Sequence, residues 1–425
     1  MVSSEGAEWK RQRSIATPAF NETSDSFLWI EMTRILKEWF EELDSRPDDS
    51  DGSISFETVG DLSQLTLLTQ LTILIGASAG FAFWKDDRLA LRTILEQSTR
   101  VSNLAIKALT PKWLFALSSR VHLPVVSKIL SHTNGIYAAV RVHMLDLVSD
   151  SRAWVVGRKA SQMDAGLLRY LVEANMAESK HRALSDDELL ANIFVLLIAG
   201  NETSAHAISL AVALLALYPI VQEKVYQETL GVWPDSVSES TTMAYEKCMP
   251  KLKYTGATFH ETLRLFPTIS RLCKVTHSDA TLTAHRFTCT ATGEVSHVMP
   301  VFTVPVKEGS LVMIDILALH KNPIYWGKDA EEFRPERFID TDTYRWPRDA
   351  FFAFSSGPRN CLGQRIALTL GVCVLANLVR RYQITLPAHL EGKPFEEQKR
   401  LLLRWIPGVT MTPLDCRVRL RRRDN

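Results

Sequence analysis

Several features that would point to other classes of protein are missing from this 425-residue sequence. Neither sign of charge dominates, because 49 Lys and Arg residues face 48 Asp and Glu residues, and the net charge is only +1. This balance gives no reason to expect nucleic-acid binding. Hydrophobic residues make up 46% of the chain and charged residues 23%, so the sequence can bury a large core and is not typical of a disordered protein.

Cysteine is scarce and irregularly spaced. The six cysteines form neither a disulfide framework nor a Cys-x-x-Cys zinc site, and they suit a reducing compartment. Five of them are interpreted as ordinary buried structural cysteines, namely Cys248, Cys273, Cys289, Cys373 and Cys416.

Uninterrupted hydrophobic runs of membrane-spanning length are also missing. Residues 1–8 show neither a signal peptide nor a span. Residues 62–84 carry no formal charge but are broken by polar side chains, and residues 189–217 carry Glu202 and His206 near their middle. Ionisable residues are expensive at bilayer depth. Both segments are therefore predicted to be buried core helices.

One cysteine, Cys361, stands in unusual surroundings. Residues 354–363 read Phe-Ser-Ser-Gly-Pro-Arg-Asn-Cys-Leu-Gly, and a helical pattern follows. The helix dipole and backbone N–H groups lower the pKa of a thiol just before a helix, and Arg359 adds positive charge nearby. Gly357 and Gly363 permit backbone angles and a close approach that a Cβ would block. We therefore expect a stabilised thiolate beside room for a flat ligand, with a buried structural cysteine as the alternative.

This loop fills every fixed position of the pattern Phe-x-x-Gly-x-Arg-x-Cys-x-Gly. It closely resembles the haem-ligand loop of the cytochrome P-450 family of haem-thiolate monooxygenases. The resemblance implies that Cys361 is the axial ligand of the iron in haem b. It further implies that Phe354 packs beside the thiolate, that Gly363 lies against the haem and that Arg359 contacts a haem propionate.

A second motif interrupts a long apolar helical pattern at residues 199–204, Ala-Gly-Asn-Glu-Thr-Ser. Thr203 can hydrogen-bond the carbonyl of Ala199 and bend the helix, and Gly200 lets a small ligand approach the backbone. Glu202 beside a hydroxyl can pass protons into a dry pocket. Alone, the run favours a simple helix kink. It also resembles the oxygen-activation motif of the family's I helix, which implies catalytic roles for Glu202 and Thr203 and places Ala199 and Gly200 beside the cofactor.

Three further residues are candidates for holding the haem propionates. Trp9 and Arg13 are four residues apart on one helix face, where an indole N–H and a guanidinium together can hold a carboxylate. An ordinary surface helix is the alternative, but the pair resembles the family's C helix. Lys274 occupies a position where relatives usually carry a propionate-binding Arg, and it keeps the charge without the bidentate fork.

A structural triad is also implied. Glu261 and Arg264 are three residues apart and match the Glu-x-x-Arg pattern of the family's K helix. Most such pairs are exposed and contribute little to stability. The resemblance implies instead that this pair is buried, that Arg337 completes it, and that the triad fixes the loop around Cys361.

The motifs follow the family's order from Trp9 to Arg423. We therefore expect residues 1–425 to form a single, mainly α domain with a small β region, the cytochrome P-450 fold. The inserts and the C-terminus resemble eukaryotic, microsomal and fungal members. Such relatives begin with a membrane anchor, helices A and B and the first sheet strands, whereas this chain starts near helix C. We expect an N-terminally truncated fold without those parts.

The resemblance implies a monooxygenase that inserts one oxygen atom from O2 into a small apolar substrate. NADPH-derived electrons would come from a flavoprotein, NADPH-cytochrome reductase, at the cytosolic face of the endoplasmic reticulum for the full-length relative. Trp113 and Leu114 either pack in the core, which is the default, or touch a membrane surface. The candidates for substrate contact are Phe194, Ile198, Thr268, Ile269 and Val409.

Two alternatives remain open. A haem-thiolate isomerase or dehydratase would need no reductase, and an intact Glu202–Thr203 pair argues against it. A truncated remnant without catalytic activity, unable to retain haem, is excluded by no motif.

Overall fold

The computed structural model describes residues 4–75, 124–157, 166–177, 183–233, 244–284, 287–289, 295–298 and 301–423. Over these ranges the chain is mainly helical with small antiparallel sheets, and the predicted fold class is confirmed. Trp113 and Leu114, the candidates for membrane contact, lie outside the described residues.

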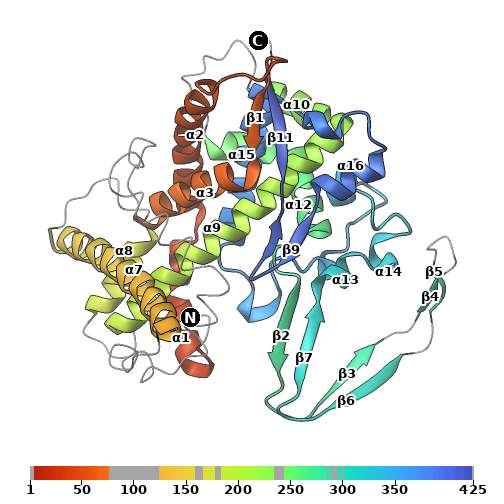
Figure 1. The fold of residues 1–425 in the computed structure, drawn as a ribbon. Coiled ribbons are helices and arrows are strands. Elements are labelled where there is room, and N and C mark those ends of the chain that lie inside the picture. Colours follow the sequence, from red (N-terminus) through yellow and green to blue (C-terminus); the bar gives the residue numbers. More distant parts are fainter. Residues whose placement is uncertain are drawn as a thin grey trace.

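Helices provide most of the described structure (Figure 1). They are α1 (Gly6–Ala16), α2 (Glu22–Asp44), α3 (Thr58–Ile75), α7 (Pro124–Gly157), α8 (Leu167–Met176), α9 (Asp186–Leu217), α10 (Pro219–Val232), α11 (Tyr245–Cys248), α12 (Lys253–Leu265), α13 (Ile316–His320), α14 (Pro323–Trp326), α15 (Gln364–Arg381) and α16 (Phe395–Leu402).

The strands are short. They are β1 (Ile54–Glu57), β2 (Arg271–Val275), β3 (Ala280–Ala284), β4 (Phe287–Cys289), β5 (Val295–Val298), β6 (Phe302–Val306), β7 (Leu311–Asp315), β8 (Tyr382–Thr385), β9 (Trp405–Pro407), β10 (Met411–Pro413) and β11 (Arg417–Arg422).

The long helix α9 runs through the middle of the molecule and packs against α3, α12 and α15 (Figure 1). It begins at a capping box, in which the Ser185 hydroxyl accepts from the Glu188 N–H and the Glu188 carboxylate accepts from the Ser185 N–H. Pro219 then opens α10. Every side chain from Ser204 to Leu217 is buried. Among the described helices, α9 alone is long and apolar enough to cross a membrane. Its burial matches the predicted core helix.

Helix α2 supplies a second wall of the core. Its apolar side chains recur at helical spacing, so Leu28, Met32, Leu36 and Leu43 all face inward and are almost fully buried. This face packs on α15, the helix that follows the Cys361 loop. The start of α15 is therefore fixed by the core.

The two ends of the described chain meet in one sheet. Strand β11, near the C-terminus, pairs antiparallel with β1 on one side and with β8 on the other. Val418 and Leu420 point into the core, while Arg419 and Arg422 form ion pairs with Asp51 and Asp44. The sheet ties the N-terminal helices to the last strand.

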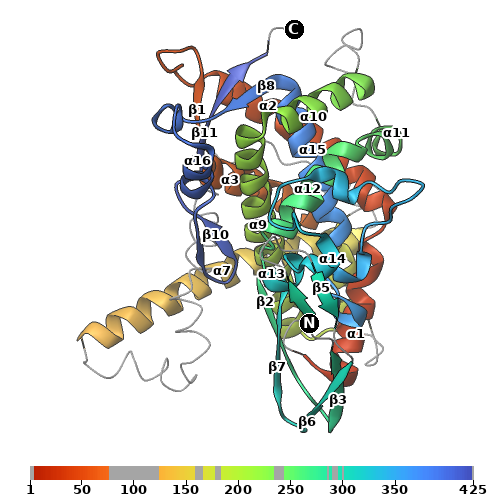
Figure 2. The same ribbon diagram turned by 90° about the vertical axis from the view of Figure 1, so that its right-hand side faces the viewer.

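A two-stranded ribbon leaves the helical body. Strand β2 pairs with β7, and β3 pairs with β6 further out. Both views show this ribbon extending away from α9 (Figures 1 and 2). Lys274 lies on β2 opposite Val312, with its side chain exposed.

Candidate functional site

The Cys361 loop is held by its own backbone. The Cys361 N–H donates to the Phe354 carbonyl at 2.8 Å, and the Asn360 N–H donates to the Gly357 carbonyl at 3.0 Å. Gly357 has φ +76°, as its predicted conformational role requires. Ser355 also has positive φ (60°), which costs free energy in a residue with a side chain and marks the loop as constrained.

Cys361 is exposed as a residue, although many protein atoms surround its thiol. Desolvation by these atoms raises the pKa of the Cys361 thiol above its ordinary value, and the Gly363 N–H and the charge of Arg13 only partly offset it. The predicted lowering of this pKa by the helix and Arg359 is therefore wrong for the protein alone. A coordinating metal ion deprotonates a thiol outright.

Helix α1 brings a guanidinium to the same loop. Arg13 donates one hydrogen bond to the Asn360 carbonyl at 3.1 Å and one to the Asn360 side-chain oxygen at 2.7 Å. The Trp9 ring lies near both Arg13 (6.0 Å) and Arg359 (4.6 Å). Arg359 also donates to the Ser4 carbonyl at 2.7 Å. Three of the four propionate candidates therefore gather beside Cys361, although Trp9 and Arg13 are almost 350 residues away in sequence.

On α9, the predicted hydrogen bond of Thr203 is confirmed, since its hydroxyl donates to the Ala199 carbonyl at 2.6 Å. The Ala199 side chain is exposed. Glu202 is half-buried. Burial raises the pKa of Glu202 above its ordinary value, because desolvation disfavours the carboxylate.

The structure contradicts the suggestion that Gly200 leaves space for a small ligand to approach the backbone. A Cβ at this position would lie 2.5 Å from the side chain of Gln70, which comes from α3. Gln70 also approaches the Gly200 carbonyl, with 3.4 Å between Nε2 and the oxygen. The glycine thus makes room for a contact between α9 and α3. No local motif could indicate Gln70, because the two residues are 130 positions apart in the sequence.

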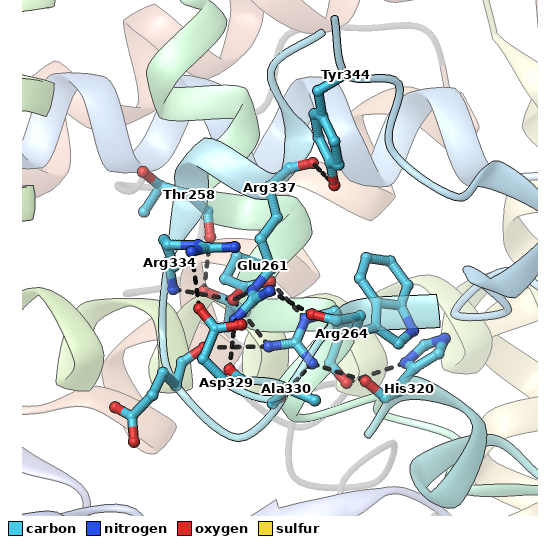
Figure 3. Close-up of polar contacts among 12 residues, drawn as sticks. Thr258, Glu261, Arg264, His320, Asp329, Ala330, Arg334, Arg337 and Tyr344 are labelled. Atoms are coloured by element: carbon cyan, nitrogen blue, oxygen red, sulfur yellow. Dashed lines mark hydrogen bonds and ion pairs between the residues drawn. The ribbon is translucent and has the colours of Figure 1, made fainter. Parts of the chain in front are cut away.

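The triad of Glu261, Arg264 and Arg337 lies in the interior (Figure 3). Glu261 accepts from Arg264 Nε at 2.6 Å and from Arg264 Nη2 at 2.8 Å, and Arg337 Nε lies 3.4 Å from Glu261. Arg264 also donates to the carbonyls of His320 and Ala330. The side chains of Glu261 and Arg264 have no exposed surface, so this pair is not one of the weak surface pairs.

His320 links this triad to the cysteine loop, a role that no sequence motif indicated. Its Nδ1 lies 3.0 Å from the Arg264 carbonyl, and its Nε2 accepts from the Phe352 N–H at 2.7 Å. The ring also stacks on Phe351 at 5.4 Å, and Phe351 in turn contacts half-buried Phe354 at 6.4 Å. Burial lowers the pKa of His320 to about 4, so the ring is neutral at pH 7 and can both donate and accept.

The residues predicted to contact the substrate lie in two parts of the fold, on α9 and near the turn between β9 and β10. Phe194 and Ile198 are half-buried on α9, and the Phe194 ring contacts Tyr137 of α7 at 5.9 Å. Thr268 is buried, and its carbonyl accepts from the Met411 N–H at 2.8 Å. Ile269 is half-buried, and Val409 is 47% exposed in the turn between β9 and β10. Thr268 is therefore the least available of these residues for contact with a substrate.

The residues present fit haem b. Cys361, an exposed residue, offers a soft sulfur donor. The space where a Cβ of Gly363 would project is open to at least 4 Å, which leaves room for a flat group near the sulfur. Arg13 supplies a positive charge at the edge of the loop. Among the described residues, no group of three or more His, Cys, Asp or Glu side chains could hold a metal ion by itself. A single thiolate suits an iron whose other ligands come from a macrocycle.

Comparison with known proteins gives a consistent result. The family model described as Cytochrome P-450 matches residues 1–290 and 294–412. The chain is 33% identical to "Cytochrome P-450 monooxygenase 124" of Postia placenta, over 100% of this chain and 76% of the relative. It is 26% identical to "Cytochrome P-450 monooxygenase claQ" of Ampulloclitocybe clavipes, over 95% and 73%. It is 30% identical to "Cytochrome P-450 3A31" of Mesocricetus auratus, over 64% and 52%.

Proposed function

The chain belongs to the cytochrome P-450 family, and we propose that it inserts one oxygen atom from O2 into a small apolar substrate with electrons derived from NADPH. Family membership makes it an oxidoreductase, a haem-thiolate monooxygenase with haem b as its cofactor. The class of substrate, the electron donor and the roles of the individual residues are what we propose here. We also propose that residues 1–425 act as a single domain.

We propose Cys361 as the iron ligand. The supporting observation is the placement of this exposed residue in a backbone-fixed loop, directly before α15 and next to Arg13. When bound, haem b supplies the oxidation chemistry, and a thiolate ligand favours O–O cleavage. Phe354 accepts the hydrogen bond of the Cys361 N–H and would hold the loop, while Gly363 would leave space for the macrocycle.

Positive charge near the loop would hold the propionates. Arg13 and Arg359 flank the Trp9 ring, and their cations would offset two carboxylates. Lys274 lies on the exposed ribbon and would contribute charge without a bidentate contact.

The proton path would start at Glu202. Its raised pKa favours a carboxyl group that keeps a proton in a half-buried position and can give it up to the site. Thr203 would orient a proton through its hydroxyl, which the Ala199 carbonyl holds in place. Gly200 would contribute less directly, because Gln70 occupies the space beside it. The buried half of α9, from Ser204 onward, would exclude water from this region.

The side chains beside this region favour an apolar substrate. Phe194, Ile198, Ile269 and Val409 all retain exposed surface in the two parts of the fold described above, and apolar groups on a substrate would bury against them. The proposed electron donor is the flavoprotein NADPH-cytochrome reductase, at the cytosolic face of the endoplasmic reticulum. The retained Glu202–Thr203 pair favours oxygen insertion over an isomerase or dehydratase reaction.

The test is isotope incorporation. The haem-loaded chain, a reductase and NADPH are incubated under 18O2 with a panel of apolar compounds, and products are analysed by mass spectrometry. One atom of 18O per hydroxylated product is expected. Products that carry oxygen from water, or that form without NADPH, would contradict the proposal.

A further inference from the structure

His320, the last residue of α13, lies between two parts of the chain that are far apart in sequence. It is completely buried. Its Nδ1 lies 3.0 Å from the Arg264 carbonyl of α12, and its Nε2 lies 2.7 Å from the nitrogen of Phe352, in the segment that leads to the Cys361 loop. Each ring nitrogen therefore has a backbone partner.

These two partners fix the tautomer of the ring. A carbonyl oxygen can only accept a hydrogen bond, so Nδ1 must carry the proton that it donates to Arg264. A backbone N–H can only donate, so Nε2 must present its lone pair to Phe352. The ring must also be neutral. Burial lowers the pKa of His320 to about 4, so this condition is met at pH 7.

The α12 side of this contact is firmly held (Figure 3). The Arg264 carbonyl belongs to the last turn of α12, where carbonyls lack a partner within the helix and a histidine side chain can supply one. In return, Arg264 Nη1 donates to the His320 carbonyl at 2.7 Å. The same guanidinium bonds buried Glu261 through Nε and Nη2. Arg264 thus fixes both the backbone and the side chain of His320.

On the other side, the Phe352 peptide is the first link of the cysteine loop. Its carbonyl accepts from the Ser355 N–H at 2.9 Å, which closes the turn in which Ser355 takes positive φ (60°). The carbonyl of Phe354 then accepts from the Cys361 N–H at 2.8 Å. Positive φ in a residue with a side chain persists only where surrounding contacts impose it. The hydrogen bond from Phe352 to His320 is such a contact.

Packing of the ring offers a competing explanation. The His320 ring stacks on Phe351 at 5.4 Å, with 5° between the ring planes, and would then only fill the interior. His260 on α12 provides a comparison. Its ring lies 5.6 Å from Phe351, while its Nδ1 bonds the Gly256 carbonyl of its own helix. The two histidines share the contact with Phe351 but differ in the hydrogen bond to the loop.

We propose that His320 is a positioning residue for Cys361, because its Nε2 holds the Phe352 N–H and thereby fixes the backbone turn that places the Cys361 sulfur. His320 acts through residues 352–361 and does not touch the sulfur itself. This inference rests on the proposed role of Cys361 as the iron ligand. It names the residue through which the buried triad acts on the loop.

Two variants separate the hydrogen bonds of His320. In His320→Gln the amide oxygen is as many bonds from the backbone as Nε2, so it can accept from the Phe352 N–H. In His320→Asn the amide nitrogen is as many bonds from the backbone as Nδ1, so it can donate to the Arg264 carbonyl, but the amide does not reach Phe352. Both variants lose the stack on Phe351. Packing alone therefore predicts equal effects, whereas the proposal predicts that only His320→Asn disturbs the loop.

The first measurement is the absorption spectrum of the haem-loaded, reduced, CO-bound protein, in urea concentrations that leave its helical circular dichroism intact. The ratio of the red-shifted to the unshifted Soret band should fall about tenfold in His320→Asn, as the loss of one buried hydrogen bond predicts. It should stay close to the wild-type value in His320→Gln and in the matched control, His260→Gln. A wild-type ratio in His320→Asn would overturn the proposal, and so would an equal loss in either of the other two variants.

The second measurement does not depend on the haem iron. Hydrogen exchange of the Phe352 amide, read by mass spectrometry of fragments of the full chain, should be slow in the wild type and His320→Gln and faster in His320→Asn. A wild-type Phe352 amide that exchanges as fast as that of exposed Ser356 would overturn the proposal even if His320→Asn fails to fold. A wild type without the red-shifted band would instead contradict the ligand assignment, while the exchange rates still decide whether His320 holds the loop.

Discussion

Accessibility separates Cys361 from most of the other described cysteines. Cys248, Cys373 and Cys416 are buried, and burial raises the pKa of the Cys373 and Cys416 thiols to about 12. The prediction that Cys273 is buried is wrong, because it lies exposed on strand β2 of the outer ribbon, with no helix following it. Of these five residues, Cys361 alone combines an exposed position, a backbone-fixed loop and a neighbouring cation.

Cys361→Ala should abolish the thiolate signature of the reduced, CO-bound protein, because no other described cysteine lies in that loop. Absorption spectroscopy after haem loading measures this. Cys273→Ala is the control, since it removes an exposed cysteine elsewhere, and it should leave the spectrum unchanged. An unaltered thiolate spectrum in Cys361→Ala would disprove the ligand assignment.

Thr203→Ala should leave haem bound but uncouple NADPH consumption from product formation, because the hydroxyl held by the Ala199 carbonyl is lost. A fall in coupling of about 10²-fold is expected if this hydroxyl takes part in proton transfer. The matched control is Thr258→Ala on α12, where a buried hydroxyl bonds the Tyr254 carbonyl in the same i to i−4 geometry. If both variants couple NADPH consumption to product formation equally well, Thr203 has no part in the mechanism.

At the residue scale, the sequence predicted what local spacing encodes. The Thr203–Ala199 bond and the shared face of Trp9 and Arg13 follow from helix geometry, and both are present. Gln70 beside Gly200 was missed, because this contact joins residues far apart in sequence and has no motif. The pKa of Cys361 was predicted in the wrong direction, since the helix and charge were weighed and desolvation by the folded chain was not.

At the scale of elements, the triad connects α12 to the segments before the cysteine loop. Arg264 binds the carbonyls of His320 and Ala330 (Figure 3). His320 in turn accepts a hydrogen bond from the Phe352 N–H. The Glu-x-x-Arg spacing made the first pair predictable. His320 was not predictable, because a lone histidine in a short helix has no distinguishing pattern. The contacts support the proposed structural role.

Glu261→Gln should lower the free energy of unfolding by about 3–5 kcal/mol, because it leaves the fully buried Arg264 guanidinium without a counter-charge, whereas Arg337 keeps its ion pair with Asp329. Denaturant titration of the haem-loaded protein measures this. Glu331→Gln serves as the control, since Glu331 is largely exposed and pairs with Lys321 at 3.7 Å. Its effect should stay below about 1 kcal/mol. Similar losses in the two variants would contradict the structural role of the triad.

At the scale of the whole molecule, Asp44 at the end of α2 joins three later elements. It accepts from Arg381 of α15 at 3.1 Å, from the Tyr382 hydroxyl of β8 at 2.8 Å and from Arg422 of β11 at 2.9 Å. Partial burial alone would raise the pKa of Asp44, but these hydrogen bonds outweigh it and hold the pKa below its ordinary value. The N-terminal helices are thereby fastened to the C-terminal strand beyond the β1–β11 pairing.

Asp44→Asn should lower the free energy of unfolding at pH 7 by about 1–2 kcal/mol, because charge-assisted hydrogen bonds are lost. A carboxyl group with a lowered folded pKa stabilises the fold above its unfolded pKa and loses that effect as the pH falls toward the folded value. The difference in unfolding free energy between the variant and the wild type should therefore become smaller below about pH 4. Denaturant titrations across this range measure it, with exposed Asp349→Asn as the control. If this difference in unfolding free energy stays constant with pH, the stabilisation by Asp44 does not come from its charge.

The central claim is that this chain holds haem b through Cys361. The most direct test is the reduced, CO-bound absorption spectrum of the 425-residue protein. The account predicts a Soret band at the red-shifted position that marks thiolate ligation. A band at the unshifted position would mean that haem is held without the thiolate, and no haem band at all would mean that the chain does not retain the cofactor. Either result would contradict the claim.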